Sequence, residues 1–276
     1  MPELPEVETV RRELVPWLTG RRITRARRAD APAGPKYRNL ERADGQRIEA
    51  VGRRGKFLLL PLSGGDELII HLGMTGIVTP KKPNQHLRVV VHLSGRKQRR
   101  LYFQDPRRFG RFLVVPTGDY RTLPTLHHLG PEPLGQAFTN AGFYRALQRS
   151  RTPIKVYIMG QRPVAGVGNI YADESLWRAR IHPLTPARRL SRTKVAALRQ
   201  AIIDILTASI AAQGTTLNDY RTVNGEVGAY LAELNAYGHA GCPCARCSTI
   251  LKRIVVGQRG TSFCPRCQRQ PRPRKQ

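Results

Sequence analysis

Acidic residues are scarce in this sequence. It holds 19 Asp and Glu against 47 Lys and Arg, which gives a formal net charge of +28 at pH 7 over 276 residues. Solubility alone does not call for such an imbalance, so the expected partner is a polyanion. Nucleic acid is the first candidate, and an anionic membrane or a generally arginine-rich proteome are the alternatives.

Long apolar runs and dispersed cysteines are also missing. No stretch approaches the roughly 20 apolar residues that a membrane helix needs, and charges occupy the N-terminus where a signal peptide would be apolar. The five cysteines all follow residue 241, unlike a disulfide framework spread through a secreted fold. We therefore expect a cytoplasmic protein that makes no membrane contact and uses its cysteines locally.

The N-terminus opens with Met1-Pro2-Glu3. If Met1 is removed, Pro2 becomes a secondary α-amine, and with a pKa of about 7.7–8.0 about a tenth of such amines are uncharged near neutrality. An uncharged amine can attack an electrophilic sugar carbon and form a covalent iminium, with Glu3 as a proton carrier. The alternative is an ordinary helix start, with proline and glutamates in the first turn and Gly20 at the end.

Short apolar runs separated by turn residues occur from residue 23 to 115 and predict strands. They lie at 57–60, 68–70, 89–91 and 112–115. We predict an α+β protein of two domains, in which residues 1–115 form a β-sandwich flanked by the opening helix. Residues 116–135, rich in proline and glycine, read as a linker.

The remaining sequence predicts a helical domain at 136–238. Apolar residues recur at helical spacing between a Ser191 cap and Gly214, which indicates a core helix. The Gly166-Val167-Gly168 run precedes a helix predicted at 170–179, whose first amides could cradle a phosphate, although a tight turn is the simpler alternative. Residues 271–276 form a basic tail.

Two cysteine pairs near the C-terminus have the spacing of a tetrahedral zinc site. They are Cys244, Cys247, Cys264 and Cys267. We predict a zinc hairpin at 239–270 that turns at residues 257–260 and carries Arg259 at its tip. One structural Zn²⁺ is expected, because four thiolates leave no position for water; redox chemistry is the weaker alternative.

These features together resemble the bacterial formamidopyrimidine-DNA glycosylase and endonuclease VIII family over nearly the whole length. Six blocks in order carry the resemblance: Pro2-Glu3-Leu4-Pro5-Glu6-Val7-Glu8-Thr9, Gly55-Lys56-Phe57, His71-Leu72-Gly73-Met74-Thr75-Gly76, Asp105-Pro106-Arg107-Arg108-Phe109-Gly110, Gly166-Val167-Gly168-Asn169-Ile170-Tyr171-Ala172 and Gln258-Arg259-Gly260-Thr261. Leu4 stands where the endonuclease VIII branch usually has glycine, which favours the formamidopyrimidine branch.

The resemblance implies that the helical domain at 136–238 is a DNA-binding domain of helix-two-turn-helix type, and it implies roles for individual residues. Pro2 would be the nucleophile at C1′ of the damaged nucleotide and Glu3 its acid/base partner. Lys56 and Arg259 match residues assigned to β- and δ-elimination. The trio Met74, Arg107 and Phe109 would fill the space left by an extruded base, and further DNA contacts are implied for His86, Arg151, Lys155 and Asn169.

Residues 221–228 resemble a loop that folds over the extruded base. Here the chain departs from the family pattern: Ala229 stands where an aromatic residue is common, Gln213 replaces a frequent glycine, and Cys242 is unusual. The lid contacts and the preference among lesions are therefore open.

The expected function is base-excision repair by a bifunctional glycosylase and abasic-site lyase that excises oxidised purines, 8-oxoguanine and formamidopyrimidines, from damaged double-stranded DNA. We expect a monomer, cytoplasmic and nucleoid-associated in a bacterium, whose one cofactor is Zn²⁺. Two rival hypotheses are an endonuclease VIII-like glycosylase for oxidised pyrimidines and a non-catalytic zinc-dependent nucleic-acid-binding protein.

Overall fold

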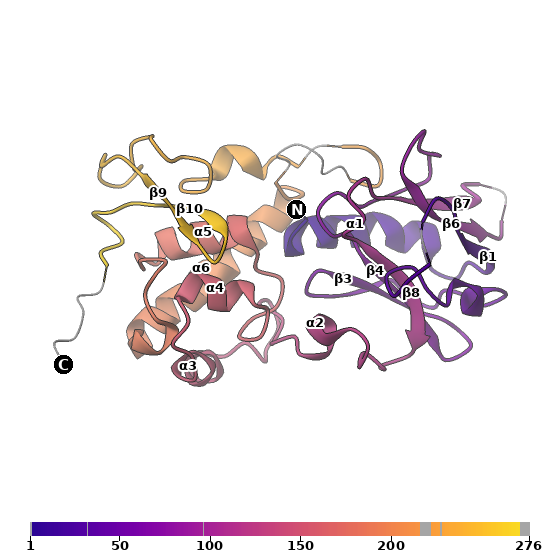
Figure 1. The fold of residues 1–276 in the computed structure, drawn as a ribbon, viewed down its shortest axis with the longest axis horizontal. Coiled ribbons are helices and arrows are strands. Elements are labelled where there is room, and N and C mark those ends of the chain that lie inside the picture. The colour runs from indigo at the N-terminus through magenta and orange to yellow at the C-terminus, as the bar shows by residue number, and fades with distance from the viewer. Residues whose placement is uncertain (1, 32, 96, 216–221, 227, 271–276) are drawn as a thin grey trace. The chain divides into compact units, whose positions relative to one another are not determined.

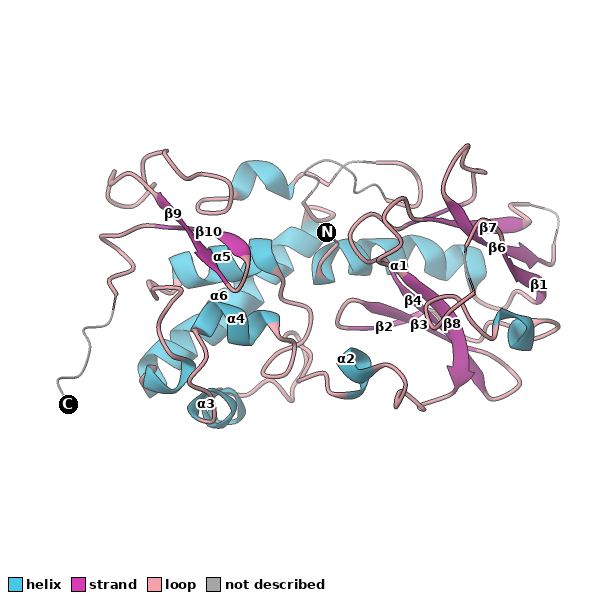
Figure 2. Ribbon diagram, viewed as in Figure 1, coloured by secondary structure: helices cyan, strands magenta, loops and turns pink. Residues whose placement is uncertain are grey.

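A computed structural model describes residues 2–31, 33–95, 97–215, 222–226 and 228–270. The chain divides into two compact units, one of residues 1–127 with 210–231 and the other of residues 128–209 with 232–276. Figure 1 follows the chain through both, and Figure 2 shows that most strands belong to the first unit and most helices to the second. The predicted domain boundaries stay predictions, and the predicted tail at 271–276 lies outside the described residues.

The first unit is a β-sandwich with a helix on it, as the sequence predicts. One sheet has the order β1-β6-β7-β5 and the other β2-β3-β4-β8, with the strands of each antiparallel. Their bounds are β1 Ile23–Arg28, β2 Gly52–Arg54, β3 Phe57–Pro61, β4 Asp66–His71, β5 Ile77–Thr79, β6 Leu87–Leu93, β7 Arg100–Gln104 and β8 Arg111–Pro116; the helical elements are α1 Leu4–Leu18, η1 Leu40–Ala43 and α2 Pro124–His127.

One apolar core holds the first unit together. Inward residues of both sheets, such as Leu58 and Val91, join Leu14 and Leu18 of α1 in a single buried cluster. The register of the sheets places alternate residues on opposite faces, so polar residues of the same strands point outward. This packing fixes the loops at the strand ends, where the expected site residues lie.

The second unit is mainly helical and ends in a β-hairpin. Its elements are α3 Asn140–Gln148, α4 Ile154–Met159, α5 Asn169–Arg178, η2 Ala187–Arg189, the greater part of α6 Arg192–Ala211, η3 Tyr230–Glu233 at its border, β9 Lys252–Val256 and β10 Arg259–Phe263. The predicted Ser191 start of α6 is confirmed, because its side chain accepts the Lys194 amide. Leu198 and Ile202 of the predicted apolar stripe are fully buried.

Among the described residues, no helix combines the length and the apolar character that crossing a membrane requires.

Candidate active site and nucleic-acid interface

Pro2 and Glu3 lie buried where α1 begins. Glu3 is the N-cap residue in extended backbone, and its amide donates a 2.7 Å hydrogen bond to the Glu6 carboxylate. The other Glu6 oxygen accepts the Thr215 amide at 2.8 Å. Gly214 has a φ of +85°, which favours glycine, and a Cβ there would displace that same oxygen, which it would approach to 2.7 Å. Glu6 thus fixes the backbone that presents Pro2; sequence analysis assigned it only a helix-end charge.

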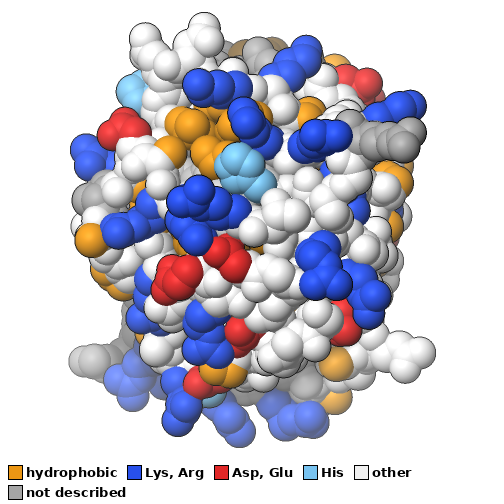
Figure 3. All heavy atoms as spheres, turned by 90° about the vertical axis from the view of Figure 1, so that its right-hand side faces the viewer, with side chains coloured by type: hydrophobic (Ala, Val, Ile, Leu, Met, Phe, Trp, Pro, Cys, Tyr) orange, Lys and Arg blue, Asp and Glu red, His pale blue; other side chains and the backbone are white. Residues whose placement is uncertain are grey.

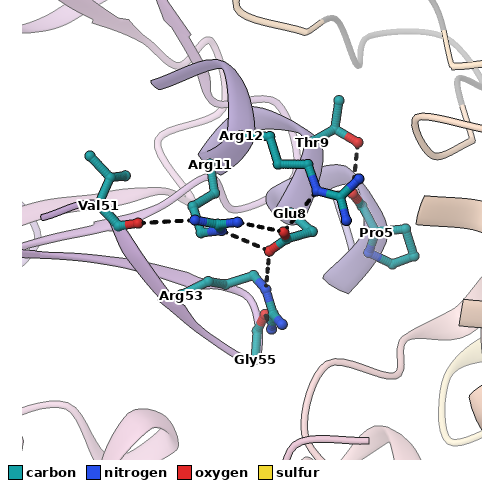
Figure 4. A network of polar contacts seen from close by, with 8 residues as sticks. All are labelled: Pro5, Glu8, Thr9, Arg11, Arg12, Val51, Arg53 and Gly55. Atoms are coloured by element: carbon teal, nitrogen blue, oxygen red, sulfur yellow. Dashed lines mark hydrogen bonds and ion pairs between the residues drawn. The ribbon is translucent and has the colours of Figure 1, made fainter. Parts of the chain in front are cut away.

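Glu8, one turn further along α1, sits among three guanidinium groups (Figure 4). Its oxygens accept bonds from Arg11 at 2.8 and 2.9 Å, from Arg12 at 3.0 Å and from Arg53 at 3.0 Å. Burial opposes the charge, but the bonds from Arg11, Arg53 and Arg12 outweigh it and lower the pKa of Glu8 to about 2. Arg53 also donates to the Gly55 carbonyl at 3.0 Å. Glu8 therefore ties α1 to the turn that carries Lys56.

Lys56 lies in the β2–β3 turn and is only 8% exposed. Gly55, before it, has a φ of +55°, in the left-handed region where glycine is unstrained. Beside Lys56, the His71 ring packs on Phe57 with centroids 4.5 Å apart, and its Nδ1 accepts the Gly73 amide at 3.1 Å.

The His71 ring is neutral near neutral pH. Its loss of hydration, followed by the charges of Lys56 and Arg111, lowers its pKa to about 3. Because Nδ1 is an acceptor, the ring proton is on Nε2. The lysine thus has an uncharged ring for a neighbour rather than a second cation.

The expected base-replacing residues occupy two loops that touch. Met74 is half-buried in the β4–β5 loop, whereas Arg107 and Phe109 are exposed in the β7–β8 loop, with Phe109 46% exposed. The Arg107 guanidinium lies 5.0 Å from the centroid of the Phe109 ring. At Gly73, φ is +66° and a Cβ would lie 2.5 Å from backbone atoms of the other loop. An exposed aromatic ring at a loop tip suits insertion into a base step.

The buried side chain of Asp105 links these two loops through hydrogen bonds. It is fully buried and accepts the Thr75 hydroxyl at 2.7 Å and the Gly110 amide at 2.7 Å. Its own amide donates to the carbonyl of His86, whose side chain is exposed. Asp105 belongs to one of the family-like blocks, but only the fold reveals that it holds Met74, Arg107 and Phe109 in place.

In the second unit, Asn169 is the first residue of α5, after a Gly168 N-cap. Its side-chain amide donates to the Gly260 carbonyl at 3.3 Å, so it reaches the zinc hairpin. The glycine turn before it is fixed by Gln161, whose side chain accepts the Gly166 amide at 2.7 Å and donates to the Val167 carbonyl at 2.5 Å. The Gly166 amide is thus bonded within the protein, whereas a phosphate site at the first amides of α5 stays a prediction.

Arg259 and Lys155 lie differently from the sequence-based expectation. The hairpin turns at Gly257-Gln258, both with positive φ, so Arg259 is the first residue of β10 and is exposed. Lys155 is wholly buried, with its ammonium 2.7 Å from Asp173.

The Lys155 ammonium has two more partners on β10. It donates to the Gly260 carbonyl at 3.1 Å and to the Thr261 hydroxyl at 2.7 Å. An ammonium group enclosed in this way fixes the part of β10 that follows Arg259, and it presents no charge at the surface. This corrects the expectation of a direct DNA contact. Arg151, by contrast, is exposed in the loop between α3 and α4.

The four predicted zinc ligands come together. The sulfur atoms of Cys244, Cys247, Cys264 and Cys267 all lie within 4.8 Å of one another, and Cys247 Sγ is 3.5 Å from two of the others. A tetrahedral site with Zn–S bonds of about 2.3 Å places its sulfurs about 3.8 Å apart, so the group fits Zn²⁺ without rearrangement. Four thiolates complete the coordination, which makes the metal structural. Cys242 is exposed and is not among the four.

Three family models match the chain in order. The formamidopyrimidine-DNA glycosylase N-terminal domain matches residues 1–112, the formamidopyrimidine-DNA glycosylase H2TH domain residues 129–221, and a zinc finger found in FPG and IleRS residues 241–270. The formamidopyrimidine-DNA glycosylase of Thermus thermophilus is 48% identical over 270 residues, covering 97% of this chain and 98% of its own. That of Deinococcus radiodurans is 47% identical, covering 97% of each. The chain belongs to the formamidopyrimidine-DNA glycosylase family.

Solved structures of the formamidopyrimidine-DNA glycosylase family have the same fold. The MutM (Fpg) protein of Thermus thermophilus superposes with a TM-score of 0.91 at 47% identity, over 98% of this chain and all of that one. Lactococcus lactis Fpg bound to abasic-site DNA matches with a TM-score of 0.86 at 34% identity, over 97% of this chain and all of that one. A MutM complex with carbocyclic 8-oxo-G DNA matches equally well at 35% identity, over 98% and all.

One departure from the formamidopyrimidine-DNA glycosylase pattern is now explained locally. Gln213 adopts a φ of +60°, the left-handed conformation that favours the glycine common in the family. Its side chain is exposed, so the cost of having glutamine here is the strain of the left-handed backbone alone. Ala229 is also exposed. The segment that resembles the family lid, residues 221–228, is described in part: Arg221 and Val227 lie outside the described residues. Residues 216–220, which precede the segment, also lie outside them.

Proposed function

We propose that this protein is a bifunctional DNA glycosylase and abasic-site lyase that removes oxidised purines, 8-oxoguanine and formamidopyrimidines, from damaged double-stranded DNA. Membership of the formamidopyrimidine-DNA glycosylase family supports the reaction class. The observation that carries the assignment is the construction around Pro2: the residue is buried beside Glu3, and the Glu6 carboxylate accepts the amides of Glu3 and of Thr215.

The first step uses the amine of Pro2 after Met1 is removed. Its nitrogen lone pair attacks C1′ of the lesion nucleotide while the bond from C1′ to the base breaks and its electrons leave with the base, which gains a proton. The ring oxygen of the sugar then leaves C1′, and an iminium joins Pro2 to the opened sugar. Glu3, the neighbouring carboxyl group, is the proton carrier for these transfers.

The iminium makes the C2′ proton acidic, and removal of this proton expels the 3′ phosphate. A second elimination expels the 5′ phosphate. Lys56 serves the first elimination. It lies in the β2–β3 turn, where Arg53 donates to the Gly55 carbonyl and to Glu8 of α1, the helix that begins next to Pro2. Arg259, at the start of β10, serves the second.

Extrusion of the damaged base leaves a space in the duplex. We assign its filling to Met74, Arg107 and Phe109, supported by the contact between their loops and by the exposure of the Phe109 ring. Asn169, Arg151 and His86 bind the DNA backbone. Lys155 acts on the DNA only indirectly, by positioning β10. The four-cysteine site maintains the hairpin and takes no part in bond breaking.

Borohydride trapping tests this function. Zinc-loaded protein whose Met1 is shown to be absent should form a covalent adduct with an 8-oxoguanine duplex on reduction. Pro2→Gly should lose most of the adduct and keep its affinity for the duplex, whereas Pro16→Ala, a change within the same helix, should trap normally. No adduct from wild-type protein would indicate a non-catalytic DNA-binding protein, and faster excision of thymine glycol than of 8-oxoguanine would indicate the pyrimidine-specific alternative.

We further propose that the protein binds damaged duplex DNA as a monomer. Each phosphate that its cations neutralise should add about −0.9 to the slope of log affinity against log salt concentration. Sedimentation of a mixture with excess protein should give one protein per lesion-containing duplex. Two proteins per duplex would contradict the monomer.

A further inference from the structure

The outer face of the β1-β6-β7 sheet combines an apolar floor with a basic rim. A concave pocket of about 410 Å³ lies there. Its lining contains Arg25, Arg27, Arg28, Lys82, Leu87, Val90, His92, Arg100 and Tyr102. No acidic side chain is among these residues. The face belongs to neither the Pro2 site nor the Asp105 loops.

The register of the sheet produces this composition directly. Arg25 on β1 lies opposite His92 on β6, which lies opposite Arg100 on β7, so one row across three strands has an arginine at each end. In the next row on the same face, Val90 lies opposite Tyr102. Residues two apart on a strand share a face, so both rows line one surface.

Most of the positive charge on this face is not neutralised internally. Arg27 is paired with Asp44 at 2.6 Å. Arg25, Arg28, Lys82 and Arg100 form no ion pair within the described part of the chain. Burial lowers the pKa of His92, and the charges of Arg100 and Arg25 lower it further.

Figure 3 looks onto the end of the first unit where β1, β6 and β7 lie. Hydrophobic side chains gather there beside a histidine, with Lys and Arg side chains next to them and Asp and Glu side chains to the left and below. An apolar centre with a polar rim is the arrangement of protein-binding surfaces. A DNA backbone would contact the cations but gain nothing from the apolar floor, because its phosphates and sugars are polar.

We propose that this face binds an acidic segment of a partner protein, which places one aromatic or branched aliphatic side chain on the floor formed by Val90 and Tyr102. Carboxylates on both sides of that side chain would pair with Arg25 and Arg100. The pocket has the volume of one or two large side chains rather than of a folded domain, so a short extended segment is the fitting occupant.

A defined peptide tests the proposal: fluorescein-labelled, nine residues long, with phenylalanine at its centre and aspartate at the other eight positions. Fluorescence anisotropy in 50 mM NaCl should show saturable binding to the full-length protein. Joint replacement Arg25→Ser and Arg100→Ser should weaken binding at least tenfold. The matched pair Arg47→Ser and Arg145→Ser, which removes the same charge from exposed sites elsewhere, should change it less than twofold.

The apolar floor has its own test. Glycine in place of the central phenylalanine should weaken binding to wild-type protein at least fivefold. Equal affinity of the two peptides, or equal loss in both double variants, would reduce the effect to net charge and overturn the proposal. Failure of the peptide to bind would overturn it as well.

Binding to DNA through this face is the other outcome to exclude. The Arg25→Ser, Arg100→Ser protein should trap on an 8-oxoguanine duplex as efficiently as the matched control, and excess undamaged duplex should leave the peptide bound. Displacement of the peptide by duplex, together with weakened trapping, would assign the face to DNA instead. Because peptide binding does not require Pro2, failure of the proposed catalytic function would leave this result unaffected.

Discussion

Replacement of Glu8 by glutamine removes the one negative charge at the centre of three guanidinium contacts. The amide keeps the size of the side chain but can no longer accept from all of its partners, and one of its ends now donates toward cations. We expect α1 and the turn that carries Lys56 to lose their mutual anchoring. The fold should survive, because the apolar core of the first unit does not include Glu8.

The size of the effect follows from the pKa. Lowering the pKa of Glu8 from 4.5 to about 2 corresponds to about 3.4 kcal/mol at about 1.36 kcal/mol per tenfold change in proton affinity. Glu8 is 10% exposed, but the Arg11 and Arg12 side chains are 28% and 58% exposed, so water screens part of the interaction. We therefore expect a loss of about 1.5–2 kcal/mol in the free energy of unfolding.

The pH dependence has a definite sign. Because the folded-state pKa of Glu8 is depressed, its contribution is complete above about pH 4.5 and is lost as the pH falls toward 2. Urea unfolding followed by circular dichroism should show the full difference between wild type and Glu8→Gln at pH 7 and less than half of it at pH 3. Glu49→Gln, at an exposed position, should match wild type at both. A deficit that stays constant between the two pH values would refute an electrostatic role for Glu8.

Three further predictions concern other parts of the structure. Gly73→Ala places a Cβ 2.5 Å from the backbone of the neighbouring loop and should cost about 2 kcal/mol or more in thermal unfolding, whereas Gly118→Ala, also at positive φ but in open space, should cost about 1 kcal/mol. Lys155→Met should destabilise by about 3–5 kcal/mol because it leaves the Asp173 carboxyl group buried without a cation, and the added change Asp173→Leu should restore part of that loss; no restoration would contradict the pairing. Cys264→Ser should lower the zinc content measured by mass spectrometry and weaken binding to an abasic-analogue duplex at least tenfold; normal zinc and affinity would disprove a four-cysteine site.

The sequence was sufficient where a function depends on residues close together in the chain. Cysteine spacing located the metal site, since each pair is three residues apart. Short apolar runs located β3, β4 and β8 of one sheet and β6 of the other. The contacts of Glu8 with Arg11 and Arg12 were also accessible in principle, because residues three and four apart on a helix are neighbours.

The rest needed the fold, because the partners are distant in sequence. Arg53 reaches Glu8, 45 residues earlier in the chain, only because β2 lies beside α1. Lys155 illustrates the limit most clearly: a lysine in a basic sequence reads as a surface residue, whereas its burial depends on Asp173, eighteen residues later, and on the hairpin beyond residue 250.

The covalent bond between protein and DNA is the central claim. After borohydride reduction of the complex with an 8-oxoguanine duplex, the crosslinked protein can be digested and its modified peptide sequenced by tandem mass spectrometry. We predict that the sugar remnant is attached to the α-nitrogen of Pro2 in a chain that lacks Met1. Attachment to a lysine side chain, Lys56 included, would contradict the mechanism.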